Sequence, residues 1–172
     1  MSLDTLAIAS VVVSLYLFYT SVKVVRESRR LVVFRLGQCI GAKGPGLVYL
    51  VPFVDRAVSV DLGEALIEIR PVICPTQDSE SIAMDLFLRW RILDPAKAVL
   101  AVADVTSALR RVAAATACSI VGAMALGDAL TQRASVGRDL REKLRKVAET
   151  WGVGVTGVEI REVRRAAASS TL

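Results

Sequence analysis

The chain has 172 residues, a net charge of +5 and 53% hydrophobic residues, and it contains no histidine. The lack of histidine removes the commonest general base and the commonest zinc ligand, which argues against enzymes that depend on either. The positive charge suits an anionic partner such as lipid headgroups. The cysteines Cys39, Cys74 and Cys118 form no CxxC pair, so we expect free thiols in a reducing compartment and no metal site.

An uncharged apolar segment covers residues 5–22. A helix of this length spans about 27 Å, close to the thickness of the hydrocarbon core of a bilayer. The flanking charges are Asp4 before the segment and, after it, Lys23, Arg26, Arg29 and Arg30. This order is the reverse of a signal peptide, and the positive-inside rule places the rest of the chain in the cytoplasm. We therefore predict a single-pass transmembrane helix over residues 1–23 in the cell membrane; the alternative is a buried core helix.

The next part of the chain is typical of β-structure. Residues 31–37 predict a strand, and the glycine-rich residues 41–46 predict a turn before the apolar run 47–54. Apolar and polar residues then alternate over 67–73 and 82–92, which predicts an antiparallel hairpin.

Helical periodicity begins after the hairpin. Asp94 followed by Pro95 is typical of a helix N-terminus. Apolar residues spaced by three and four predict helices over about 104–124 and 135–151. Alternation returns over 153–163 and predicts a last strand that rejoins the sheet. Strands followed by helices and one closing strand indicate an α+β fold.

The sequence contains no catalytic motif of the GxSxG, HExxH or P-loop type. Asp78 and Glu80 are two carboxylates in the predicted hairpin loop, where a solvated turn explains them. The basic residues over 138–146 have no aromatic residues between them, which argues against binding to single-stranded nucleic acid. We therefore predict no enzyme activity, no cofactor, no catalytic or metal-binding residue and no nucleic-acid partner.

A series of short motifs follows one another in a specific order. They are Val32-Val33-Phe34-Arg35-Leu36-Gly37, Gly44-Pro45-Gly46-Leu47, Leu50-Val51-Pro52-Phe53-Val54-Asp55-Arg56, Val60-Asp61-Leu62, Thr76-Gln77-Asp78-Ser79, Arg91-Ile92-Leu93-Asp94-Pro95-Ala96-Lys97-Ala98, Trp151-Gly152-Val153 and Val158-Glu159-Ile160. Together they resemble the stomatin/prohibitin family, also called SPFH or band 7, and most closely its stomatin-like slipins. The resemblance covers about residues 24–164.

The resemblance implies an SPFH domain over residues 24–164, with helices packed on an antiparallel sheet and a returning C-terminal strand. It further implies a membrane-anchored scaffold without a catalytic centre, which forms homo-oligomers, contacts membrane lipids in a microdomain and organises or regulates membrane partners at the cytoplasmic face. The alternatives within this class are a regulatory partner of a membrane-bound protease and a membrane-tethered adaptor without assembly. From other classes, a tethered enzyme or nucleic-acid binder stays open.

The sequence departs from the family pattern in two places. Residues 165–172 form a short tail, where stomatin-like chains continue into a long coiled-coil helix, and the usual Leu-Pro after the last strand is missing. This departure puts assembly into large rings in doubt. Residues 5–22 contain no proline, whereas animal stomatins carry a proline-bent membrane hairpin, so we expect a straight span.

Two sets of surface residues are candidate interaction sites. The membrane-contact set consists of Leu47, Tyr49, Leu50, Phe53, Lys23, Arg26, Arg29 and Arg30. The alternative for its apolar members is a buried pair of strands. The oligomer-contact set lies on the charged face of the helix over 135–151 and consists of Arg138, Arg141, Glu142, Arg145, Lys146 and Glu149. The alternative for this set is a face that only solvates the domain.

Overall fold

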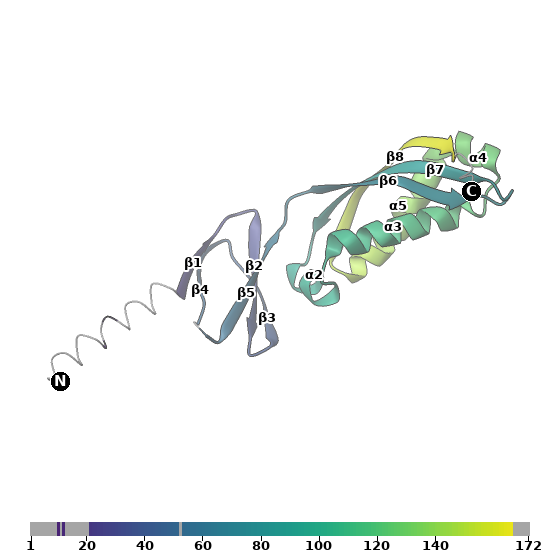
Figure 1. The fold of residues 1–172 in the computed structure, drawn as a ribbon. Helices are drawn as coiled ribbons and strands as arrows, with labels where there is room; N and C mark the ends of the chain where they lie inside the picture. The colour runs from purple at the N-terminus through teal and green to yellow at the C-terminus, as the bar shows by residue number, and fades with distance from the viewer. Residues whose placement is uncertain (1–9, 11, 13–20, 52, 167–172) are drawn as a thin grey trace. The chain divides into compact units, whose positions relative to one another are not determined.

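The computed structural model describes residues 10, 12, 21–51 and 53–166, and the chain divides into two compact units, 1–63 and 64–172 (Figure 1). Most of the predicted transmembrane segment lies outside the described residues. Within the described part of the chain, no helix has both the length and the apolar character needed to cross a membrane. Val22 and Lys23, which we placed at the end of the span, instead begin the first strand.

The N-terminal unit contains two small antiparallel sheets. Strand β1 (Val22–Val25) pairs with β4 (Gly46–Tyr49), and β2 (Arg29–Arg35) lies between β3 (Gln38–Lys43) and β5 (Asp55–Asp61). The β-branched residues of these segments favour extended backbone. Its small core consists of Val25, Leu31, Val33, Val48 and Leu50. The predicted turn over 41–46 starts later than expected, because β3 continues to Lys43.

The C-terminal unit has one three-stranded sheet with helices packed on it. Strands β6 (Ala65–Pro75) and β7 (Ser81–Ile92) form the predicted hairpin, and β8 (Val153–Arg165) pairs with β7 on its other side. All three strands are antiparallel. The α+β prediction, with a returning C-terminal strand, is therefore confirmed.

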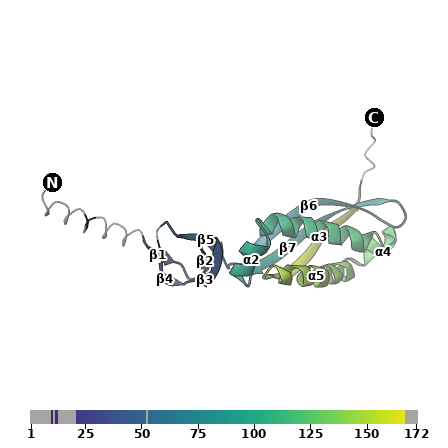
Figure 2. The ribbon, with the colours of Figure 1, turned by 90° about the horizontal axis from the view of Figure 1, so that it is seen from below.

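Four helices connect β7 to β8: α2 (Pro95–Ala101), α3 (Val105–Val121), α4 (Leu126–Thr131) and α5 (Arg133–Thr150). Helices α3 and α5 lie side by side on the same face of the sheet (Figure 2). Leucines from α3, α5 and β7 meet in the core between them, and they include Leu86, Leu88, Leu109, Leu140 and Leu144. Asp94 caps α2 as predicted, since its carboxylate accepts hydrogen bonds from the backbone of Ala96 and Lys97 at 3.1 Å.

Gly152 ends α5 and fixes the start of β8. Its φ of +69° is in the left-handed region, and a Cβ atom there would lie 2.8 Å from the carbonyl oxygen of Asp94. The carbonyl of Gly152 also accepts hydrogen bonds from the backbone of Leu93 and Asp94, both at 2.9 Å. Only glycine fits this contact without strain.

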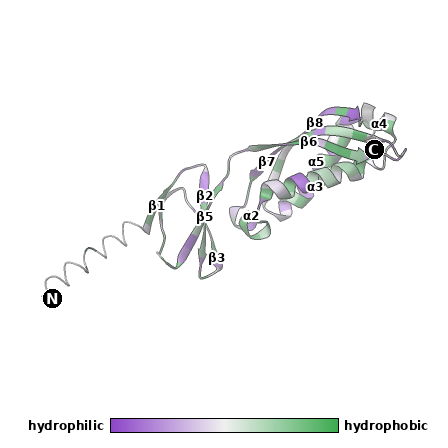
Figure 3. Cartoon of the chain, in the orientation of Figure 1, coloured by the Kyte–Doolittle hydropathy of each residue, from purple (hydrophilic) through white to green (hydrophobic). Residues whose placement is uncertain are grey.

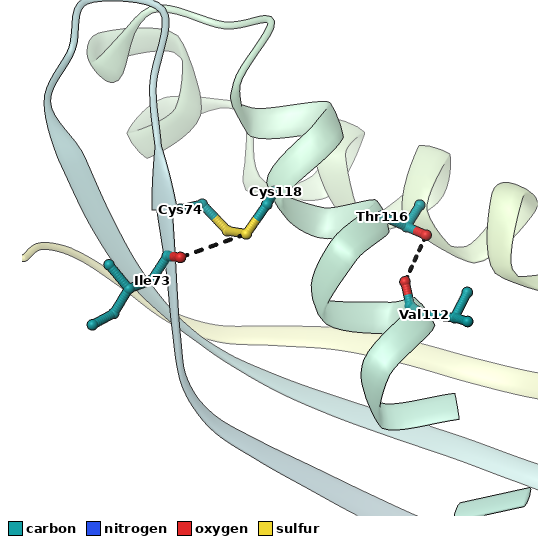
Figure 4. The surroundings of a disulfide bond; sticks show 5 residues. All are labelled: Ile73, Cys74, Val112, Thr116 and Cys118. Atoms are coloured by element: carbon teal, nitrogen blue, oxygen red, sulfur yellow. Dashed lines mark hydrogen bonds between the residues drawn. A yellow bond between two sulfur atoms is a disulfide. The ribbon is translucent and has the colours of Figure 1, made fainter. Parts of the chain in front are cut away.

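The expectation of three free thiols is wrong, because Cys74 and Cys118 form a disulfide between β6 and α3 (Figure 4). Their Cα atoms are 4.8 Å apart, since α3 packs on the inner face of β6. The Sγ of Cys118 also lies 3.6 Å from the carbonyl oxygen of Ile73, as a contact only, because a disulfide sulfur has no proton to donate. Cys39 keeps a free thiol.

Candidate membrane-contact surface

Strands β1 and β4 present an apolar face to the solvent. Val22 lies opposite Tyr49 and Val24 opposite Leu47, so the four side chains point to the same side of the ribbon. Val24 is 79% exposed and Leu47 is 77% exposed, and the other two side chains are exposed as well. We call these four residues the ribbon face. Single exposed apolar residues are common on proteins, but four on one side of a two-stranded ribbon form a patch.

The opposite side of the same ribbon carries the exposed Lys23 and two buried valines. Val25 and Val48 belong to the core of the N-terminal unit, and Leu50, just after β4, joins them with only 7% of its surface exposed. The sequence left two interpretations open for the apolar run over 47–54, membrane contact or burial in a pair of strands. Each interpretation fits some of its residues. Leu47, Tyr49 and Phe53 reach the surface, whereas Leu50 packs inside the unit.

A turn after β4 places a second apolar group at the surface. Phe53 is 98% exposed and has a φ of +68°, and Leu36, in the turn between β2 and β3, is 85% exposed with a φ of +49°. The backbone N–H of Leu36 donates to the carbonyl of Val54 at 3.4 Å, which brings the two turns together. A positive φ is unfavourable for both residue types, so the surroundings must hold them in place.

Asp55 holds the turn that carries Phe53. Its carboxylate accepts two hydrogen bonds from the Arg35 guanidinium, at 2.7 and 2.9 Å, and one from the backbone N–H of Val51 at 2.9 Å. These bonds favour the ionised form, with that from Arg35 the strongest, and lower the pKa of Asp55 from 3.8 to about 2. The Arg35–Asp55 pair thus ties the end of β2 to the start of β5 and to the turn between them.

The four basic residues of the predicted membrane-contact set differ in how they are held. Lys23 and Arg26 are exposed. Arg29 forms an ion pair with Asp61 at 3.5 Å, and the Arg30 guanidinium donates to the backbone carbonyls of Glu27 and Arg29 at 2.9 Å. Lys23 and Arg26 therefore keep the greatest freedom to meet an anionic headgroup.

The predicted oligomer-contact set on α5 separates into two parts. Lys146 pairs with Glu142 at 3.1 Å, and Arg145 pairs with Glu149 at 3.6 Å, each one turn apart on the same helix. Arg138 and Arg141 instead line a groove between α5 and β8. Four of the six charged residues that we expected to contact a neighbouring copy are therefore paired with each other within α5.

Sequence reasoning missed three exposed apolar residues, Val22, Val24 and Leu36. Val22 and Val24 continue the apolar segment, so they were placed in or next to the transmembrane span. The signal that could have assigned them to a strand is Lys23 between them, because it begins an alternation of apolar and charged residues. Leu36 was read as part of a strand.

Hydropathy along the chain is shown in Figure 3. In the part of the chain that the structure describes, no three His, Cys, Asp or Glu side chains gather in a metal-binding arrangement.

Comparison with known proteins matches this sequence to a family. The model of the SPFH domain / Band 7 family matches residues 23–169. A protein of Archaeoglobus fulgidus is 35% identical over 153 residues, which are 89% of this chain and 61% of the relative. A stomatin homologue of Pyrococcus horikoshii is 32% identical over 84% of this chain and 54% of its own length. Mouse stomatin is 32% identical over 83% of this chain and 51% of its own length.

The chain therefore belongs to the SPFH/Band 7 family. Within that family it is similar to stomatin and its homologues. It spans between about half and three-fifths of the length of the relatives described here. The function of those longer proteins as a whole is therefore only proposed for this chain.

Proposed function

We propose that this protein is a membrane-anchored scaffold that lies against a bilayer with the ribbon face of its N-terminal unit, associates with copies of itself there, and organises or regulates membrane partners. Membership of the stomatin-like group supports the membrane association. The observation that carries the proposal is the ribbon face itself, an exposed apolar surface that starts at Val22, the last residue of the apolar segment 5–22.

The energetics favour contact with lipid. Full burial of a Val, Leu or Phe side chain contributes roughly 1.5–3 kcal/mol, whereas a basic residue at an anionic surface contributes about 1 kcal/mol. The ribbon face and Phe53 would therefore supply the larger share of the binding free energy. Lys23 and Arg26 would add an electrostatic part that depends on salt.

Self-association would rest on confinement more than on charge pairs. The ion pairs of the α5 surface lie within one helix, and exposed pairs contribute about 0–1 kcal/mol each. Anchoring many copies in one membrane raises their effective concentration without any new contact. Weak lateral contacts are then sufficient for assembly.

Depth measurements on the full chain in vesicles test the membrane contact. An environment-sensitive dye is attached to a cysteine introduced at Leu47, Tyr49 or Phe53, in a Cys39→Ser background. Matched controls place the dye at Leu66 or Ile73, which are exposed apolar residues of the C-terminal unit. We expect lipid-chain quenchers to reach the first three sites and not the controls. Equal exposure to water at all five sites would contradict the proposal.

We propose that the folded units lie on the cytoplasmic side, because four basic residues follow the apolar segment directly. The disulfide is a reason to test this, since disulfides persist mainly in oxidising compartments, although intracellular proteins of hyperthermophiles also carry them. A cysteine introduced at Ser79, in the exposed β6–β7 loop, should not react with a membrane-impermeant reagent in intact cells. Labelling before lysis would place the domain outside.

A further inference from the structure

A basic groove of about 450 Å³ runs along α5 beside the end strand of the sheet. From α5 it is lined by Arg133, Ala134, Gly137, Arg138 and Arg141, and from β8 by Val158, Glu159, Ile160 and Arg161. The α5 residues are spaced by one, three and four, so they form one stripe of the helix. Helix α5 packs along β8, which brings the two elements of the groove together (Figures 1 and 2).

The charge of the groove is unbalanced. Four arginines face one carboxylate, and that carboxylate, Glu159, already forms an ion pair with Arg89 at 3.2 Å. Among the residues that the structure describes, neither Arg138 nor Arg141 forms an ion pair. Guanidinium groups bind carboxylates with two parallel hydrogen bonds, so these two side chains are suited to an acidic partner.

Strand β8 adds backbone donors and acceptors to the same groove. The strand order β6-β7-β8 leaves one edge of β8 without a partner strand in the described part of the chain. An unpaired edge can accept an extended segment by strand addition, which a lipid headgroup or a helix cannot use. This edge favours a peptide segment over an anionic lipid as the occupant.

The side-chain alternation of β8 places basic groups on both sides of such a segment. Val158 and Ile160 pair with Leu88 and Leu86 on the helix side of the sheet, where Arg138 and Arg141 lie. Arg161 lies on the open side, with its guanidinium carbon 4.7 Å from the centre of the Phe87 ring. Successive residues of an added strand point to opposite sides, so acidic residues at either parity would meet an arginine.

Gly137 leaves space for the occupant. A glycine inside a helix costs about 1 kcal/mol relative to alanine, so this position in the 18-residue helix α5 is unfavourable for the helix alone. A Cβ atom at Gly137 would have no neighbour within 4 Å, which means that the space above it is open to the groove. An incoming chain can therefore approach the helix backbone closely at this point.

From these observations we infer that the groove between α5 and the edge of β8 binds an acidic, extended segment of a partner protein by strand addition. The inference rests on the proposed scaffold function, since it names the kind of partner that the scaffold holds. It uses none of the residues of the ribbon face.

The test uses the full chain in phosphatidylcholine nanodiscs and a labelled peptide of alternating glutamate and threonine, with binding followed by fluorescence anisotropy. Replacing Arg138→Gln and Arg141→Gln together should weaken binding by about tenfold or more, because two charge-assisted contacts are lost. The matched control is Arg110→Gln with Lys143→Gln, which makes the same charge change at two exposed residues that do not line the groove. We expect the control to bind as the unaltered chain does.

Two further variants separate strand addition in this groove from general attraction of charge. The same peptide with an N-methyl group on every residue should not bind, because neither of its edges can then donate hydrogen bonds to a strand. Gly137→Leu should block the groove without harming the helix, whereas Lys143→Leu should have no effect on binding. Three results would each overturn the inference. They are an equal loss of peptide binding in the Arg138, Arg141 variant and in the control pair, binding of the methylated peptide, and peptide binding by the Gly137→Leu chain.

The remaining outcomes distinguish this inference from the function on which it rests. Crosslinked oligomers are measured in the same samples. If the unaltered chain fails to bind the peptide while its oligomers form, the groove assignment is wrong and the scaffold function stands. Phosphatidylserine vesicles test the other source of negative charge. If they displace the peptide from the unaltered chain, and if they bind the Arg138→Gln, Arg141→Gln chain more weakly, the groove binds a lipid headgroup and the inference is wrong.

Discussion

At the scale of single residues, the Arg35–Asp55 pair holds the exposed Phe53 turn in place. The pKa of Asp55 is lowered to about 2, so the folded state keeps this carboxylate ionised where the unfolded chain would bind a proton. The stabilising contribution is therefore complete above about pH 4 and is lost as the pH falls toward 2. The order of the turn should follow the same pH window.

We expect Asp55→Asn to lower the midpoint of denaturant unfolding at pH 6 and to remove part of the acid dependence between pH 4 and pH 2. Arg35→Lys keeps the charge but loses the paired hydrogen bonds, and it should have a smaller effect in the same direction. Unfolding curves at several pH values check this. An Asp55→Asn chain with the same acid dependence as the unaltered chain would disprove the role of the pair.

Two glycines should respond to alanine in opposite ways. Gly137→Ala should raise the free energy of unfolding by about 1 kcal/mol, because the helix gains propensity and the new methyl group meets no neighbour. Gly152→Ala should lower it by more than 1 kcal/mol, since φ is +69° and the methyl group would contact Asp94. Thermal and denaturant unfolding of both variants measure the difference. The same sign for both would contradict the assigned conformations.

At the scale of elements, the disulfide joins β6 to α3 across 44 residues of chain. A crosslink over a loop of this length stabilises a protein by about 4 kcal/mol in the chain-entropy model and by 2–4 kcal/mol in typical measurements. We therefore expect reduction to lower the free energy of unfolding by about 2–4 kcal/mol. The Cys39→Ala chain, treated in the same way, is the control and should lose as much. No change on reduction would mean that the bond is not formed in the protein.

Regular elements of the C-terminal unit could be predicted from their periodicity. The alternation in β7 and the three-four spacing in α5 each have a buried side and a solvated side, so the pattern determines the face. The disulfide could not be predicted, because nothing in the spacing of Cys74 and Cys118 shows that α3 crosses β6 at that point. The pairing depends on tertiary packing.

The N-terminal unit was harder to predict for a different physical reason. Its strands are short, and its apolar residues serve both a small core and an exposed surface. Leu50 and Phe53 lie in one apolar run with similar hydropathy, yet one is buried and the other is exposed. The sequence therefore located this part of the candidate site, but it could not show which of its apolar residues are buried and which are exposed.

At the scale of the whole molecule, we propose that the protein assembles on a membrane through weak contacts. Without the membrane, surface ion pairs are too weak to hold copies together, so a chain without residues 1–20 should sediment mainly as a monomer or dimer. With it, confinement raises the effective concentration and assembly should follow.

Chemical crosslinking of the full chain in membranes, at low and at high salt, tests this claim most directly. The account predicts a ladder of oligomers at low salt that shortens as the salt concentration rises, because screening weakens contacts between exposed charges. A chain that stays monomeric in the membrane at low salt would contradict the scaffold function and leave a tethered adaptor in its place.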